Sequence, residues 1–113
     1  MIFITGPMYS GKKEYISSAL GIRPEDLASR AVWDVQDLAV GDPEQIADRL
    51  ADYSIVIETE IGGGVVPVDS ADRAHREAAG RLACLLAKRA DTVIRVCCGL
   101  PQLLKGDWPC RSS

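Results

Sequence analysis

The 113-residue sequence predicts a three-layer α/β domain with a small, mainly parallel sheet. Short apolar runs of strand length alternate along the chain with segments whose apolar residues recur every three or four positions. Such alternation is typical of parallel sheets covered by helices on both faces. The length suits one domain, which we place at residues 1–105, and we expect residues 106–113 to form a poorly ordered tail.

In the first half of the chain, apolar runs and glycines mark the elements. Residues 2–5 form an apolar run that predicts a buried strand. A helix is expected from residue 11 or 12 to Leu20, closed by Gly21 in the left-handed conformation. Residues 23–30 are polar and predict a loop or a single helical turn, and residues 31–35 predict a second strand.

The second half begins with a helix signal, in which Asp42 is the expected cap and Gln45 completes a capping box. The β-branched run at residues 53–58 then predicts a strand. The longest helix is expected at residues 70–89, where alanines and leucines recur at spacings of three and four. Residues 92–98 predict a further strand, ended by a glycine.

Composition and charge narrow the class of protein. The net charge of −3 and a pI of about 5.1 argue against a broad basic surface for nucleic acid. No apolar run approaches the roughly 20 residues of a membrane-spanning helix, and the first residues lack the basic start of a signal peptide. We therefore expect a cytoplasmic protein without a membrane partner. The four cysteines form no C-x-x-C pair, so we expect reduced thiols, mostly packed inside.

A motif of the form G-x-x-x-x-G-K lies between the first predicted strand and the first predicted helix. A loop in that position can direct backbone N–H groups and the positive end of a helix at a phosphate. Lys12 would reach the terminal phosphates of a nucleotide and is the candidate catalytic residue. The predicted nucleotide-binding residues are Gly6, Pro7, Met8, Tyr9, Ser10, Gly11, Lys12 and Lys13. The motif predicts a P-loop NTPase-like domain that binds ATP or GTP, and the alternative is an ordinary glycine-rich turn.

Lys13 departs from the full motif, in which Ser or Thr follows the lysine and its hydroxyl helps to hold Mg²⁺. A cation in that place cannot ligate magnesium and would compete with it. Lys13 therefore weakens the case for Mg²⁺ as a cofactor alongside ATP or GTP, and with it the case for metal-assisted phosphoryl transfer. Asp34 or Asp37, at the end of the second predicted strand, is the candidate replacement for a metal-binding carboxylate.

Several stretches of the second half follow one another in register. They are E-I-G-G-G-V-V-P at 60–67, Arg73, Arg76-Glu77, Gly80-Arg81-Leu82, A-D-T-V at 90–93 and G-L-P at 99–101. They resemble the N-E-V-G-x-G-I-V-P, R-x-x-R-D, G-R-L, A-D-E-V and G-L-P elements of the adenosylcobinamide kinase/adenosylcobinamide-phosphate guanylyltransferase family. Residues 4–12 are similar to that family's V-T-G-G-x-x-S-G-K-S start.

The resemblance implies a P-loop fold in which a nucleoside triphosphate phosphorylates a corrinoid side chain, followed by GMP transfer through a histidine. It also implies a homo-oligomer. The implied substrate- or phosphate-binding residues are Glu60, Gly62, Gly63, Gly64, Arg73 and Arg76. For the two arginines, contact with a partner subunit or a solvated helix face is the alternative.

The middle of the chain has no counterpart of the family's D-C-L-T-x-W strand or of its histidine segment. Guanylyl transfer is therefore not expected, and His75, on the longest predicted helix, is not assigned the covalent role. We expect a reduced adenosylcobinamide kinase-like protein that binds a purine nucleoside triphosphate and, as a second ligand, a corrinoid. The alternatives are a non-catalytic nucleotide sensor or partner-binding protein, and a structural remnant without a ligand.

Overall fold

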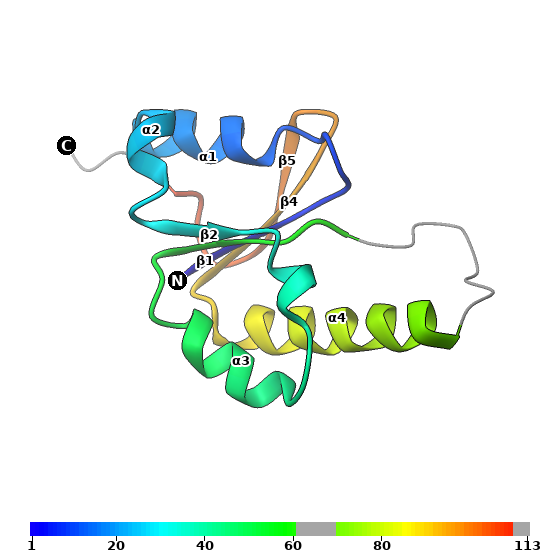
Figure 1. Cartoon of the computed structure of the whole chain (residues 1–113). Helices are drawn as coiled ribbons and strands as arrows, with labels where there is room; N and C mark the ends of the chain where they lie inside the picture. The colour runs from blue at the N-terminus through cyan, green and yellow to red at the C-terminus, as the bar shows by residue number, and fades with distance from the viewer. Residues whose placement is uncertain (61–69, 110–113) are drawn as a thin grey trace.

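The computed structural model describes residues 1–60 and 70–109. Two layers of helices enclose a central sheet (Figure 1). In chain order the elements are β1 (Ile2–Thr5), α1 (Lys12–Leu20), α2 (Pro24–Leu27), β2 (Ala31–Trp33), the 3₁₀ helix η1 (Val35–Leu38), α3 (Pro43–Leu50), β3 (Ile55–Ile57), α4 (Ser70–Arg89), β4 (Thr92–Cys97) and β5 (Leu100–Lys105). The predicted three-layer α/β architecture is confirmed.

The sheet has five strands in the order β2-β3-β1-β4-β5. All neighbours are parallel except β4 and β5, which are antiparallel, so the prediction of a small, mainly parallel sheet is correct. Strand β5 was not predicted, because the preceding strand was expected to end at Gly99. Cys98 and Gly99 both have positive φ, 54° and 75°, as the tightest hairpin turns require, and they return the chain along β4.

Two hydrophobic clusters cover the two faces of the sheet, and side chains alternate between them. Phe3 and Val56 join the cluster under α3 and α4, whereas Ile4 and Ile57 join the cluster under α1 and α2. Successive residues of a strand therefore lie on opposite faces of the sheet. This alternation becomes important where the strands end.

The helix boundaries were predicted better than the strand boundaries. Gly21 closes α1 with a φ of 66°, and α4 covers the predicted residues 70–89. Asp42 caps α3 by accepting the N–H of Glu44 at 3.0 Å, but among the described residues Gln45 makes no hydrogen bond that would complete the capping box. The predicted N-cap is therefore confirmed, and the predicted capping box is wrong.

Strands β2 and β3 are shorter than their apolar runs. The second strand was predicted to extend to Val35, but Asp34 takes a φ of 58° and precedes the first residue of η1.

The expectation that the thiols are packed inside is wrong for Cys84 and Cys98, which are exposed, and Cys97 is half-buried. Within residues 1–60 and 70–109, no helix is long and apolar enough to span a bilayer.

Candidate functional site

The segment Gly6–Lys12, called the glycine loop below, joins β1 to α1 at the carboxyl edge of the parallel strands. Gly6, Tyr9 and Gly11 have positive φ values of 155°, 58° and 87°. A Cβ atom at Gly6 would lie 2.1 Å from the carbonyl oxygen of Val96, so no side chain fits there. The first glycine of the motif is thus required by the close approach of β4.

Neighbouring segments hold the glycine loop in place. The N–H of Glu60 donates to the Gly6 carbonyl at 2.9 Å, and the N–H of Gly99 donates to the Ser10 carbonyl at 2.8 Å. These bonds attach both ends of the loop to the chain beyond β3 and to the β4–β5 turn. The loop is therefore shaped by the protein itself, which is the preorganisation that a binding loop needs.

The Lys12 side chain turns back into the glycine loop. Only 8% of the residue is exposed, and its Nζ donates to the carbonyls of Pro7 at 2.6 Å and Gly6 at 3.2 Å and to Ser10 Oγ at 3.5 Å. Burial lowers the pKa of Lys12, while the negative charges of Asp34 and Glu60 oppose that effect. The loop therefore surrounds an ammonium group next to the N-terminus of α1.

Lys13 takes a different direction from Lys12. Its ammonium lies over the ring of Trp33, 4.3 Å from the ring centroid. This cation–π contact holds the charge beside β2. The second lysine of the motif therefore does not fill the interior of the glycine loop.

A cavity of about 420 Å³ opens beside the glycine loop. The loop side of its wall consists of Met8, Tyr9, Ser10, Gly11, Lys12, Lys13 and Glu14, and the facing side consists of Asp34, Gln36, Asp37, Ile57 and Thr59. The structure thus places most of the predicted nucleotide-binding residues and both candidate metal carboxylates around one space. Sequence reasoning missed Gln36 and Thr59, although both are polar residues that closely follow predicted strands.

Hydrogen bonds fix the facing side of this cavity. The Thr59 N–H donates to Gln36 Oε1 at 2.9 Å, and the Thr59 hydroxyl donates to Asp34 Oδ1 at 3.2 Å. One oxygen of Asp34 therefore already accepts a hydrogen bond. Among the described residues, no three His, Cys, Asp or Glu side chains are grouped so that they could hold a metal ion. The side chains within residues 1–60 and 70–109 therefore do not fit a metal ion held by the protein alone.

Glu60, Arg73 and Arg76, which were also predicted to bind the substrate or its phosphate, do not line this cavity. Both oxygens of Glu60 accept from Arg95, Oε1 from Nε at 2.7 Å and Oε2 from a terminal guanidinium nitrogen at 3.0 Å. Arg73 and Arg76 belong to the N-terminal part of α4 and do not line the cavity. Gly62, Gly63 and Gly64 fall in 61–69, outside the described residues.

Glu58 is a third residue at this edge that was not predicted from the sequence. It is 5% exposed, and its Oε2 atom is buried without a hydrogen-bond partner among the described residues. Burial and, second, the charge of Glu60 raise the pKa of Glu58 to about 7, against the opposing effect of Lys12. A charged residue directly after an apolar strand was the available signal.

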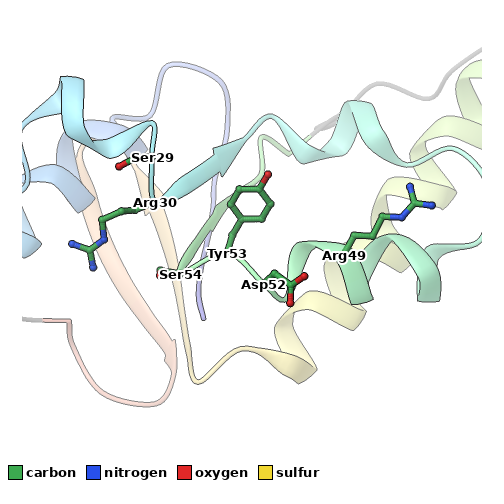
Figure 2. A pocket seen from close by; sticks show the side chains of 6 residues that line it. All are labelled: Ser29, Arg30, Arg49, Asp52, Tyr53 and Ser54. Carbon is green, nitrogen blue, oxygen red and sulfur yellow. The ribbon is translucent and has the colours of Figure 1, made fainter.

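A second pocket, of about 490 Å³, lies at the opposite edge of the sheet, where β2 and β3 begin. Its wall includes two arginines and a tyrosine, but Figure 2 shows Arg30 and Arg49 pointing away from one another on either side of Tyr53. The two cations do not converge on a common point. Because open α/β sheets bind ligands at their carboxyl edge, the cavity beside the glycine loop is the better candidate.

The fold and the glycine loop define an α/β protein whose candidate ligand site lies at the carboxyl edge of a parallel sheet. Residues 37–104 match the family model described as cobinamide kinase / cobinamide phosphate guanyltransferase. The match covers more than half of the 113 residues, and the chain belongs to this family. The matched segment begins after the glycine loop. No curated protein matches the chain.

Proposed function

We propose that this protein binds a purine nucleoside triphosphate at the glycine loop and acts in cobalamin biosynthesis as a cobinamide kinase-type phosphotransferase. The observation that carries the proposal is the buried Lys12 ammonium, enclosed by a preformed glycine loop at the edge of a 420 Å³ cavity. Family membership adds the nature of the reaction, since the family's description names a kinase and a guanyltransferase.

Binding would exchange one set of partners of Lys12 for another. In the free protein the ammonium donates to the Pro7 and Gly6 carbonyls. A nucleotide phosphate offers stronger, charged acceptors, and the loop N–H groups and the N-terminus of α1 add donors on the same side. Tyr9 is 96% exposed on the cavity wall, and we propose that it contacts the nucleotide or the second substrate.

In the proposed reaction, a corrinoid hydroxyl oxygen forms a bond to the γ-phosphorus. The bond between that phosphorus and the β,γ-bridging oxygen breaks, the nucleoside diphosphate leaves and the hydroxyl proton is released. Lys12 would neutralise the charge that develops on the transferred group. We assign Glu60, Arg73, Arg76 and the glycines 62–64 to the acceptor or its phosphate, and we do not propose guanylyl transfer.

Magnesium enters this proposal as the counter-ion of the nucleotide, because the described residues do not form a metal site of their own. Of the carboxylates on the cavity wall, we assign Asp34 to face such an ion. We also propose a homo-oligomer, since the edge strand β5 leaves Leu100 and Leu104 exposed.

A non-catalytic nucleotide sensor is the second candidate. Lys13 in place of the metal-binding hydroxyl favours it, because a sensor needs the phosphate loop but not the metal.

Thermal-shift and calorimetric titrations with ATP and GTP, each with and without Mg²⁺, test binding. We expect a higher melting temperature with at least one nucleotide and its loss in Lys12→Ala. Lys88→Ala, which removes an exposed lysine in the last turn of α4, should keep the response. Transfer of the γ-phosphate to cobinamide identifies the kinase, whereas metal-independent binding without transfer identifies the sensor. If neither nucleotide binds, both proposals are wrong.

A further inference from the structure

The chain remains paired with the neighbouring segment beyond the end of β3. The Glu58 N–H donates to the Ile4 carbonyl at 2.8 Å, and the Glu60 N–H donates to the Gly6 carbonyl at 2.9 Å. Because side chains alternate along such a paired segment, Thr59 faces the cavity and Glu58 and Glu60 lie on the other side. The Glu60–Arg95 pair lies on that side too.

The two glutamates differ in their partners. Arg95 occupies both oxygens of Glu60, whereas the Oε2 atom of the nearly fully buried Glu58 has no partner among the described residues. A buried carboxylate oxygen without a hydrogen bond is costly, so the surroundings of Glu58 favour its neutral form. The same carboxyl group lies close enough to Lys12 for the ammonium charge to favour its ionised form.

The charged groups at this edge influence whether the Glu58 carboxyl group is protonated or ionised. Lys12 comes from α1, Glu60 follows β3, Arg95 comes from β4 and is held by Glu60, and Asp34 after β2 acts on Lys12. Of the charged residues in the N-terminal part of α4, Arg73 and Arg76 have interactions of their own. Lys12 is thus the cation whose surroundings a bound nucleotide would change most directly.

We infer that Glu58 is the proton-linked residue of the glycine loop and takes up a proton when nucleotide phosphates engage Lys12. The inference rests on the proposed nucleotide binding. Bound phosphates partly neutralise the positive charge of Lys12 and bring negative charge to the edge. Both effects favour the neutral form of the Glu58 carboxyl group. The proton comes from the solvent and adds to the carboxylate, so no other bond changes.

The direction of the pH effect follows. The pKa of Glu58 is about 7 in the free protein and is higher in the complex, so binding takes up a proton between those two values. At pH 7.5 the uptake should approach about 0.8 proton per site, the ionised fraction of a group with that pKa. The dissociation constant should be level below about pH 6 and rise up to about tenfold per pH unit above pH 7.

Calorimetric titration of MgATP and MgGTP at pH 7.5, in buffers of different ionisation enthalpy, measures this uptake. Wild-type protein should show a buffer-dependent heat, and Glu58→Gln should bind without it. Glu25→Gln is the matched control, because Glu25 is an exposed carboxylate on α2 that does not line the cavity, and the buffer dependence should persist. Binding by wild type without buffer dependence, or an unchanged uptake in Glu58→Gln, overturns the inference and leaves nucleotide binding intact. No binding of either nucleotide overturns both.

A second measurement protects the test against misfolding of the variant. Wild-type protein titrated at pH 5.5, where Glu58 is already protonated, should lose the buffer-dependent heat seen at pH 7.5. Uptake that is undiminished at pH 5.5 overturns the inference without any variant.

Discussion

The carboxyl edge of the sheet is built from two parts of the chain, the glycine loop and the segment that matches the family model. The glycine loop lies before residue 37 and is described by its geometry, whereas the chain from α3 to β4 and nearly all of β5 lie within the segment that matches the family. The two parts are joined by hydrogen bonds, from Glu60 to Gly6 and from Gly99 to Ser10. The family-matched segment therefore holds the loop in its shape, and changes on either side should be felt on the other.

Gly6→Ala should produce the largest effect, because it breaks the contact between the loop and β4. The new Cβ atom would lie 2.1 Å from the Val96 carbonyl, and we expect a loss of about 3 kcal/mol of unfolding free energy together with the loss of nucleotide binding. Chemical denaturation measures the stability. Gly80→Ala is the control, because nothing lies within 4 Å of a Cβ there and alanine should stabilise α4 by about 0.5–1 kcal/mol. Equal stability of Gly6→Ala and wild type would contradict the close contact.

The pH dependence of stability should be the next largest effect. The pKa of Glu58 in the folded protein, about 7, lies above its unfolded value, so its contribution is fully present below about pH 4.5 and is lost as pH rises through 7. The loss amounts to roughly 2–3 kcal/mol. Denaturation from pH 4.5 to 8 should show it, and the curve of Glu58→Gln should be flatter. Parallel curves for the two proteins would show that Glu58 is not the group responsible.

Glu60→Gln sharpens the comparison between the two glutamates. Its pair with Arg95 is partly exposed, so the loss of stability should be at most about 1 kcal/mol. Because the charge of Glu60 raises the pKa of Glu58, its removal should lower that pKa. The chemical shift of the Glu58 carboxyl carbon, followed by NMR during a pH titration, reports the change. An unchanged titration midpoint in Glu60→Gln would show that the charge of Glu60 does not act on Glu58.

Lys13→Ser restores a hydroxyl at the position where the motif has one, and its effect on stability should be the smallest. It removes the cation–π contact with Trp33, worth about 0.5–1 kcal/mol at an exposed site. If the protein is a kinase, magnesium-dependent phosphate transfer should rise in this variant. No change in transfer, with binding retained, would favour the sensor.

The loop and the helices could be predicted from the sequence because their signals are local. Gly21, Asp42 and the motif around Lys12 each act on a few neighbouring residues. The hairpin to β5 was missed because Cys98 is not a typical residue for a left-handed turn. Glu58 was missed for a different reason, since its burial depends on how β3, the glycine loop and β4 meet, which no short stretch of sequence records.

The backbone amide signals of residues 6–12, followed by NMR as ATP or GTP is added, test the central claim most directly. The account predicts that the largest shifts fall on the glycine loop and on the N-terminus of α1, and that they vanish in Lys12→Ala. Shifts that instead gather around Arg30 and Arg49 at the opposite edge, or no shifts at all, would contradict it.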